Sequence, residues 1–209
     1  MFGLRAKPPE LREDAWDEPP HGTLLLRRLK LADRREWHAV RRANRDWLTP
    51  WEATVPFVEG EPHPTGGTYS DYLSSLNASA RAGESFMWGM FVDGRFAGQI
   101  SLGSISYGSL RNAHIGYWVS QEFAGRGITP TAVAMIVDYA FQDLKLHRIE
   151  INIRPENRAS LRVAEKLGLR FEGLRERYLH INGQWADHNA YAITAEECGL
   201  GMMRRWRNG

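Results

Sequence analysis

Apolar residues in the middle of the chain follow a two-residue period, which is the pattern of β-strands. Ser85 to Val92 is nearly all apolar, and Asp93-Gly94 directly after it is a strong signal for a two-residue hairpin turn. After the turn, apolar residues alternate with other residues at Phe96, Ile100 and Leu102. Arg111 to Val119 adds a third strand whose apolar residues share one face. This region is predicted to form a run of antiparallel strands.

Helical periodicity appears on both sides of this strand region. Ala32 to Trp47 and about Tyr69 to Arg81 precede it, and Ile128 to Leu144 follows it with one continuous apolar stripe. A further helix is predicted to begin after Asn157, a good N-cap residue. It should end at Gly168, because glycine commonly follows the last helical residue.

Four more strands complete the predicted fold. Thr23 to Leu29 is the first, and His147 to Arg154 alternates strictly between isoleucine and polar residues. Phe171 to Gln184 and Trp185 to Ile193 pair through Asn182-Gly183, a typical hairpin turn. The order of strands and helices predicts an α/β sandwich around a mixed sheet, and not a doubly wound parallel sheet.

Composition is typical of one compact domain, assigned here to residues 21–198. The chain has 209 residues, of which 43% are apolar and 25% charged, enough to build one core. Residues 1–20 contain four prolines, so we predict a flexible tail. No apolar stretch of signal or membrane-spanning length appears, and Cys198 is the only cysteine, so we expect a cytoplasmic protein without disulfides or membrane contact. Val55 to Gly67, rich in Pro and Gly, should be a loop, either a lid or a connector.

The charge balance argues against a dedicated nucleic-acid binder. The formal net charge is only +2, so no direct nucleic-acid binding is expected. Arg204, Arg205 and Arg207 surround Trp206, and we interpret residues 199–209 as a basic tail that is either solvated or contacts a partner. The seven histidines lack the spacing of a ligand set, so no metal is expected.

One segment has the pattern of an anion-binding turn. The strand residues Tyr117-Trp118-Val119 lead into Gly125-Arg126-Gly127-Ile128-Thr129 at the start of a helix. Free amide groups in the first helical turn attract phosphate, and glycine lets phosphate approach the backbone closely. The glycine spacing fits neither a dinucleotide fingerprint nor a Walker loop. Coenzyme A is therefore the phosphate ligand that fits best, although an ordinary junction between loop and helix would also explain two glycines.

With its neighbours, this turn resembles the GNAT superfamily of acetyltransferases, and within it the RimJ/RimL-type branch that acetylates protein N-termini. The resemblance covers most of the chain. It implies the GNAT fold, with a mixed, mostly antiparallel central sheet flanked by helices on both faces, and acetyl-CoA as co-substrate. The segments that carry it are Trp47-Leu48-Thr49-Pro50-Trp51, Gly116-Tyr117-Trp118-Val119, Gly125-Arg126-Gly127, His147-Arg148-Ile149-Glu150, Asn157-Arg158-Ala159-Ser160, Leu167-Gly168, Phe171-Glu172-Gly173, Asn182-Gly183-Gln184-Trp185 and Asp187-His188.

The resemblance implies a role for each segment in holding acetyl-CoA. Tyr117 to Val119 would pair with the pantetheine amides, Gly125 to Thr129 would hold the pyrophosphate, and Asn157 with Ser160 would lie beside the sulfur. Two positions depart from the common pattern. Glu122 replaces a Gln or Arg before the first glycine and is expected to face solvent. Ala164 replaces a tyrosine that protonates the leaving thiolate, which leaves Ser160 as the candidate donor.

The resemblance also implies a base and an acceptor site. Glu172 matches a carboxylate that takes the proton of the amine in RimL-like enzymes, and Glu150 is the reserve candidate. Trp47, Trp51 and Trp185 resemble the wall of the acceptor site, although core packing is an alternative for each of them. A protein α-amine has a pKa near 8, so about a fifth of it is neutral near pH 7.4 and the base need not be strong.

Three functions remain open at this stage. The preferred one is acetylation of the N-terminal α-amine of a protein, plausibly a ribosomal protein. The second is acetylation of a small amine, such as an antibiotic or a polyamine. The third is an acyl-CoA-binding module without turnover, which the departures at Glu122 and Ala164 allow. Both a monomer and a homodimer are compatible with the sequence.

Overall fold

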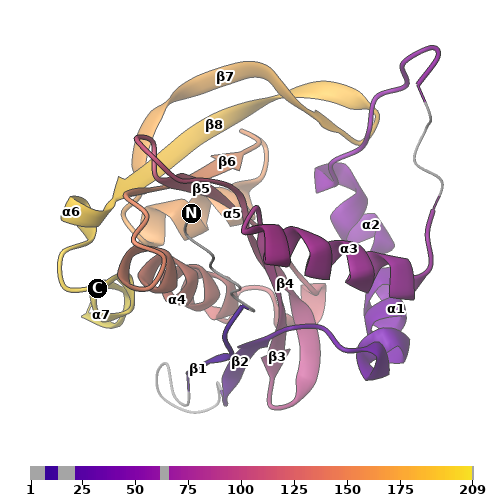
Figure 1. The fold of residues 1–209 in the computed structure, drawn as a ribbon, viewed down its shortest axis with the longest axis horizontal. Helices are drawn as coiled ribbons and strands as arrows, with labels where there is room; N and C mark the ends of the chain where they lie inside the picture. The colour runs from indigo at the N-terminus through magenta and orange to yellow at the C-terminus, as the bar shows by residue number, and fades with distance from the viewer. Residues whose placement is uncertain (1–7, 14–21, 62–65, 209) are drawn as a thin grey trace.

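We describe residues 8–13, 22–61 and 66–208 of a computed structural model of the chain. One eight-stranded sheet forms its centre, in the strand order β1-β2-β3-β4-β5-β6-β8-β7 (Figure 1). The strands are β1 (Leu11–Glu13), β2 (Leu24–Arg27), β3 (Phe86–Val92), β4 (Arg95–Ser106), β5 (Asn112–Val119), β6 (Arg148–Ile153), β7 (Arg170–Ile181) and β8 (Gln184–Thr194). The α-helices are α1 (Arg34–Ala43), α2 (Arg45–Leu48), α3 (Tyr69–Ala82), α4 (Ile128–Gln142), α5 (Arg158–Lys166), α6 (Ala195–Cys198) and α7 (Met202–Asn208), and the short 3-10 helices are η1 (Leu31–Asp33), η2 (Thr49–Trp51) and η3 (Gln121–Phe123).

Strands β5 and β6 form the one parallel pair of this sheet, and every other neighbouring pair is antiparallel. Their register covers three pairs and ends where His114 lies opposite Glu150. Beyond that point the two strands separate, although β5 continues to Val119 and β6 to Ile153. The edge of β5 that faces β6 therefore carries backbone groups that are not used by the sheet. The mixed, mostly antiparallel sheet agrees with the prediction.

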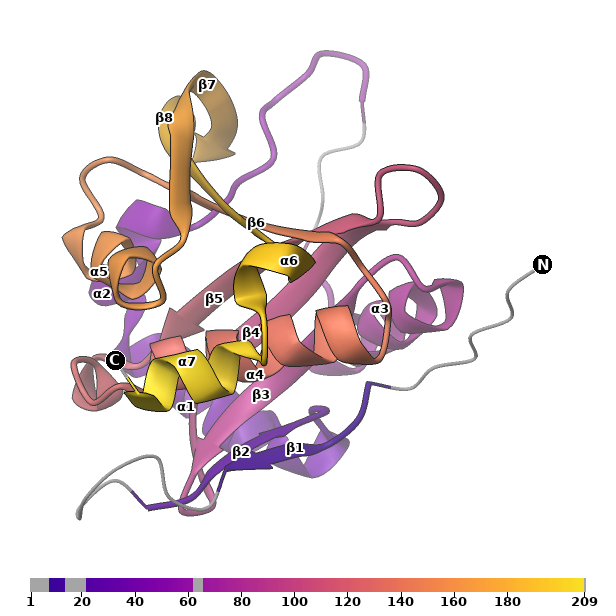
Figure 2. The ribbon, with the colours of Figure 1, turned by 90° about the vertical axis from the view of Figure 1, so that its left-hand side faces the viewer.

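Apolar cores lie on both faces of the sheet. The larger core packs α4 against buried residues of the central strands, including Trp88, Ile100 and Ile149. A smaller core around Phe91 and Phe96 lies on the opposite face, where α1 and α3 contribute Trp37, Val40, Tyr72 and Leu73. Figure 2 shows α4 and α7 in front of the sheet, with α1 and α3 behind it. The helices on both faces confirm the predicted layers.

The predicted helix from Ala32 to Trp47 is interrupted at Asn44, which is a correction to the sequence analysis. Asn44 is buried and has φ −108°, outside the helical region. Its side-chain amide donates to the Val40 carbonyl at 2.8 Å and to Ser120 Oγ at 3.0 Å, and its Oδ1 accepts from Gln121 N at 2.7 Å. These contacts attach α1 and α2 to the segment between β5 and α4.

Both terminal segments contain regular structure where tails are expected. Leu11–Glu13 forms β1 and pairs with β2, while residues 1–7 and 14–20 of the expected N-terminal tail lie outside the described residues. At the other end, α7 packs on α4. The Trp206 indole N–H donates to Thr131 Oγ1 at 2.9 Å, Met202 is buried, and its amide donates to the Asp138 carboxylate at 2.6 Å. The apolar residues between the arginines explain why this segment folds back on the domain.

The long β7–β8 hairpin arches over the top of the sheet and ends beside the segment after η2 (Figure 1). The Thr54 amide donates to the His180 carbonyl, and the Asn182 amide donates to the Glu52 carbonyl, both at 2.9 Å. Asn182 and Gly183 both have positive φ, as the predicted turn requires. Among the helices in the described ranges, none is long and apolar enough to cross a membrane.

Candidate active site

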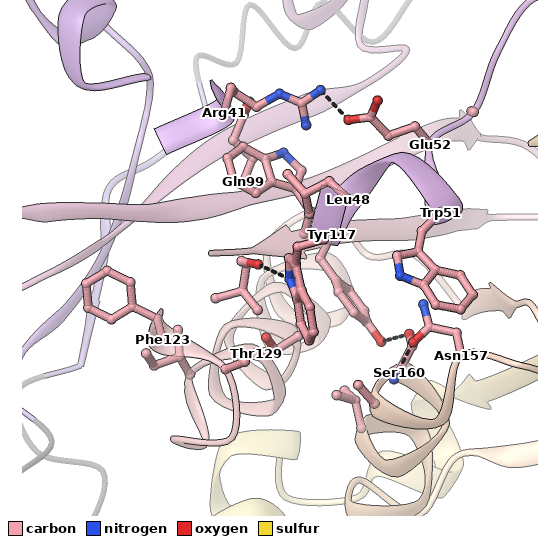
Figure 3. A pocket seen from close by; sticks show the side chains of 18 of the residues that line it. Arg41, Leu48, Trp51, Glu52, Gln99, Tyr117, Phe123, Thr129, Asn157 and Ser160 are labelled. Carbon is pink, nitrogen blue, oxygen red and sulfur yellow. Dashed lines mark hydrogen bonds and ion pairs between the residues drawn. The ribbon is translucent and has the colours of Figure 1, made fainter. Parts of the chain in front are cut away.

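A pocket of about 1440 Å³ lies beyond the point where β5 and β6 separate (Figure 3). Ligand pockets commonly measure about 300–1,000 Å³, so this one has room for a long cofactor arm and a second molecule. Its wall is built by the end of β5, the turn before α4, the start of α5 and parts of α1, α2 and α3. One half of the pocket is formed by the end of β5, the turn before α4 and the start of α5. The other half, called the aromatic half below, contains Trp37, Trp47, Trp51, Tyr69 and Tyr72.

The end of β5 forms one wall of the pocket with Tyr117, Trp118 and Val119. The Trp47 indole N–H donates to the Val119 carbonyl at 3.0 Å, which holds the strand end in place. Strand β4 pairs with one edge of β5, and β6 has already separated from the other edge. That second edge is open for amide groups of a ligand. The geometry therefore suits an extended, amide-containing chain such as pantetheine.

The glycine turn leads from η3 into α4 and faces the same pocket. Gly125 and Gly127 have φ of +79° and +75°, a backbone region that suits glycine. A Cβ built on Gly125 would meet no protein atom within 4 Å, so the space beside it is open. Ile128 and Thr129 follow in the first turn of α4, where backbone N–H groups have no partner within the helix. An anion fits this cradle.

The two charged residues next to the glycines do not line the pocket. Arg126 does not line the pocket; its guanidinium lies over the Phe123 ring, 5.6 Å from the ring centroid. Glu122 forms an ion pair with Arg95 at 2.9 Å and is about half exposed. The departure at Glu122 therefore brings no negative charge to the glycine turn. Of the predicted phosphate-binding residues, all but Arg126 line the pocket.

Ser160 lies at the start of α5 and contacts two other predicted residues (Figure 3). Asn157 caps the helix, because its Oδ1 accepts from the Ser160 amide at 3.1 Å. The Tyr117 hydroxyl lies 2.6 Å from Ser160 Oγ. Burial raises the pKa of Tyr117 to about 12, so the phenol stays protonated at neutral pH. Ser160 and Tyr117 thus form a hydrogen-bonded hydroxyl pair inside the pocket.

The Tyr117 hydroxyl was not assigned any chemistry in the sequence analysis, which used this residue only as part of the cofactor strand. The position where many relatives have a tyrosine, Ala164, is fully buried and packs in the main core. The signal for Tyr117 was its place on the same strand face as Ile115 and Val119. The partner on α5, however, lies 43 residues away in the chain.

The other half of the pocket holds a hydrogen-bonded row of three side chains. The Trp37 indole N–H donates to Gln99 Oε1 at 2.8 Å, and Gln99 Nε2 donates to the Tyr72 hydroxyl at 2.8 Å. An indole N–H can only donate, so the orientation of the buried Gln99 amide is fixed. Tyr72 accepts from Gln99 and keeps its own O–H proton free to donate into the pocket.

Each carboxylate that lines the pocket already has a partner. Glu52 pairs with Arg41, which also lies 5.2 Å from the Trp118 ring centroid. Asp71 accepts hydrogen bonds from the hydroxyl and amide groups of Thr68, which lower its pKa. Glu156 pairs with Arg154 at 3.2 Å. Glu52 and Glu156 are thus neutralised by arginines, whereas Asp71 keeps its negative charge, because Thr68 is neutral.

The predicted tryptophans of the acceptor wall take different places. Trp47, in α2, and Trp51, at the end of η2, line the pocket. Trp185 does not; it lies on β8 near the hairpin tip, is 57% exposed, and packs edge-on against the His180 ring. The structure thus brings two of the three to the aromatic half.

Glu172 and Glu150, the two predicted bases, are not among the pocket residues. Glu172 accepts hydrogen bonds from Arg148 and from Arg170, which lower its pKa to about 2. Burial opposes the ionisation of Glu150, but hydrogen bonds from Arg148 and Arg175 give it a lowered pKa as well. The sheet order explains this, because β7, which carries Glu172, is two strands further from β5 than β6 is. These ion pairs suit a structural role.

We expect Glu172→Gln to destabilise the fold by roughly 1 kcal/mol at pH 7, because it removes a partly exposed carboxylate from two arginines. The folded-state pKa of Glu172 is depressed, so its contribution is present above the unfolded-state pKa, near 4.3, and is lost as the pH falls towards 2. Urea unfolding of both proteins at pH 7, 5, 4 and 3 measures the difference.

The control for this prediction is Glu176→Gln, on the same strand and exposed. Its effect on the free energy of unfolding should be small. A free-energy difference for Glu172→Gln that stays constant from pH 7 to pH 3 would contradict the assigned ion pairs.

Within residues 8–13, 22–61 and 66–208, no group of three or more His, Cys, Asp or Glu side chains is placed to hold a metal ion. The pocket itself presents hydroxyl, amide, indole and backbone groups. Their arrangement suits binding of an anionic, amide-containing cofactor and protonation of a leaving group by Ser160.

Comparison with known proteins identifies the family. Residues 23–170 match the family of the acetyltransferase (GNAT) domain. The probable N-acetyltransferase YjcK of Bacillus subtilis (strain 168) is 34% identical over 173 residues, which are 82% of this chain and 93% of that protein. The ribosomal protein uS5-alanine N-acetyltransferase of Escherichia coli (strain K12) is 28% identical over 201 residues, covering 94% of this chain and 97% of that protein.

Solved structures agree. Mycobacterium smegmatis RimJ in complex with CoA-disulfide superposes with a TM-score of 0.80 at 38% identity, and the match covers 89% of this chain and 88% of that one. The resemblance to the RimJ/RimL type is thereby confirmed. The chain belongs to the GNAT family of acetyltransferases and is an acetyl-CoA-dependent N-acetyltransferase.

Proposed function

We propose that the protein transfers the acetyl group of acetyl-CoA to the N-terminal α-amine of a protein, and that the acceptor is a ribosomal protein. The Escherichia coli relative described above is named for this reaction on ribosomal protein uS5, and it matches nearly the whole chain. The observation that carries the proposal is the chemistry of the pocket, where Glu52 and Glu156 are ion-paired and the Tyr72 O–H proton has no acceptor among the described residues.

The aromatic half suits a peptide better than a polyamine. A polyamine carries several positive charges and needs several carboxylates without cationic partners, whereas Glu52 and Glu156 are ion-paired and Asp71 is the one such carboxylate among the described lining residues. A peptide N-terminus carries one amine and a nearby carbonyl group. The free O–H proton of Tyr72 can donate to that carbonyl, while Trp37 and Trp51 offer apolar surface to the first side chain.

The proposed mechanism uses direct transfer. Bound acetyl-CoA supplies a thioester that an amine can attack without a covalent enzyme intermediate. In this chain, the open edge of β5 orients the pantetheine arm and the turn from Gly125 to Thr129 holds the pyrophosphate. Ser160, backed by the Tyr117 hydroxyl, donates a proton to the departing sulfur. An α-amine with a pKa near 8 is partly neutral already, so its nitrogen can bond to the thioester carbon as the carbon–sulfur bond breaks. The extra proton on the nitrogen passes to water, and water returns a proton to Ser160.

Two synthetic peptides with the same sequence, one with a free N-terminus and one blocked, test the proposal. Each carries one internal lysine. We expect CoA release with the free peptide only. The ratio kcat/KM should rise about tenfold per pH unit up to about pH 8 and then level off, because the α-amine is the reacting group. A lysine acceptor would continue to rise towards pH 10.

Other outcomes point to the alternatives. Equal rates on the free and blocked peptides would exclude an N-terminal acceptor. Rapid turnover of polyamines or aminoglycosides, with no turnover of peptides, would assign the enzyme to small amines. Tight binding of acetyl-CoA without CoA release on any amine would indicate a binding module, against our proposal.

A further inference from the structure

Positive charge is concentrated in one short part of the chain. Residues 27–45 contain eight arginines and lysines and two acidic residues, a net charge of +6. Because the whole chain has a net charge of +2, the other 190 residues sum to −4. The low total therefore hides a strongly basic region, which comprises the end of β2, η1, α1 and the start of α2.

Four arginines of this region are exposed, and their guanidinium groups have no hydrogen bond or ion pair with any described residue: Arg34, Arg35, Arg42 and Arg45, here called the arginine surface. Three other arginines of the basic region do have side-chain partners: Arg27 pairs with Asp33, Arg28 with Asn77 and Arg41 with Glu52. Arg34 and Arg35 also open α1, where the helix dipole disfavours positive charge. These side chains are arranged unfavourably in the free protein, and an anionic partner would relieve the repulsion.

The shape of this surface indicates an extended anion. Arg34, Arg35 and Arg42 surround a shallow hollow on the outer side of α1, together with His38 and Ala39. From Arg34 to Arg45 the helical segments extend roughly 16 Å. That length covers about five phosphates along one strand of a nucleic acid, at about 3.4 Å per phosphate. A single small anion would engage only part of it.

The residues between the arginines argue against other partners. From Arg34 to Arg45 the exposed apolar side chains are Ala39 and Ala43, while Trp37 and Val40 pack inward against the smaller core. Leu31, just before α1, is the one bulky exposed apolar side chain among residues 27–45. A membrane-surface helix needs bulky apolar residues to insert, and a stable protein interface needs an apolar centre. A surface of arginines without exposed bulky apolar residues between them suits phosphate groups, because the fork-shaped guanidinium donates two parallel hydrogen bonds to a phosphate.

We propose that the arginine surface binds the phosphate backbone of RNA. This inference rests on the proposed function, since a ribosomal acceptor protein lies among RNA phosphates. The inner side of α1 contributes Trp37 and Arg41 to the active-site pocket, and His38 borders both the pocket and the hollow. RNA held on the outer side of α1 would therefore present an attached acceptor protein at the mouth of the pocket.

Fluorescence anisotropy with a labelled 20-nucleotide single-stranded RNA tests the proposal, without acceptor or acetyl-CoA. For four ionic contacts, the log–log dependence of affinity on salt should have a slope of about −3, equivalent to roughly 50-fold weaker binding at 200 mM than at 50 mM NaCl. The triple variant Arg34→Gln, Arg35→Gln, Arg42→Gln should bind at least about 30-fold more weakly at 50 mM, with a slope smaller in magnitude by about 2.

The matched control is Arg81→Gln, Arg177→Gln, Arg204→Gln, which removes the same charge from exposed positions elsewhere. It should keep the affinity and the slope. None of the six positions lines the pocket, so both triple variants should acetylate a short peptide at the wild-type rate, which also verifies that they are folded.

Three results would overturn the proposal. The wild-type protein does not bind the RNA at 50 mM NaCl, or the two triple variants lose affinity equally, or a 20-residue polyglutamate displaces the RNA at equal charge concentration. The last result would assign the surface to an acidic protein. Because RNA binding is measured without the reaction, failure of the proposed acetylation and failure of this inference are observed separately.

Discussion

Replacing Ser160 by alanine is expected to lower kcat for acetyl transfer by about 100-fold and to leave the Kd of acetyl-CoA within about threefold. Ser160 Oγ is the hydroxyl placed in the pocket beside Asn157, and Tyr117, 2.6 Å away, can return a proton to it. Proton donation by a positioned group typically contributes 10²-fold or more, and it acts on the departing thiolate rather than on cofactor binding. Thiol release gives kcat, and calorimetry gives the Kd.

Two further variants sharpen this prediction. Tyr117→Phe removes only the supporting hydroxyl, so we expect a smaller loss of about tenfold in kcat. Ser74→Ala, on an exposed position of α3 outside the pocket, is the matched control and should behave as the wild type. If Ser160→Ala retained the wild-type kcat, with thiol release still rate-limiting, the sulfur would leave without help from this hydroxyl.

Gly125→Val is expected to raise the Kd of acetyl-CoA by about 100-fold. The residue has φ +79°, and a new side chain would occupy the open space where the pyrophosphate is expected. The substitution also strains the backbone, because the left-handed region costs a residue with a Cβ about 1–2 kcal/mol. Calorimetric titration with acetyl-CoA measures the Kd, and thermal unfolding measures the strain.

The chain offers a closely matched control at Gly94 in the β3–β4 turn. Gly94 has φ +80°, and a Cβ there would likewise meet nothing within 4 Å. Gly94→Val should therefore destabilise the fold by a similar amount and leave the Kd unchanged. Equal losses of affinity in the two variants would show that strain, and not occupation of the phosphate site, weakens binding.

Predictions from local sequence were accurate where a few adjacent residues determine the conformation. Asp93-Gly94 and Asn182-Gly183 form hairpin turns with positive φ. Helix α5 starts after the Asn157 cap and is followed by Gly168, which has φ +61°, as predicted. These signals depend on backbone geometry and on hydrogen bonds within one or two turns, so they can be read without knowledge of the fold.

The net charge of the whole chain does not reveal how its charges are distributed along the sequence. A net charge of +2 argued against nucleic-acid binding, but this total averages the basic region at residues 27–45 with an acidic remainder. Which of the arginines there lack a partner depends on distant residues such as Asn77 and Glu52, so only the folded chain separates paired from unpaired charges.

The sequence by itself determined the order of the main strands and helices from β2 to β8, the glycine turn before α4 and the family to which the chain belongs. Only the tertiary structure decided that Asn44 interrupts the first long helix, that Tyr117 meets Ser160, and that Glu172 lies outside the pocket. The contacts responsible join residues far apart in the chain, 43 positions for Tyr117 and Ser160 and 76 for Asn44 and Ser120. Such pairings depend on how whole strands and helices pack against one another, so they cannot be predicted from the spacing of neighbouring residues.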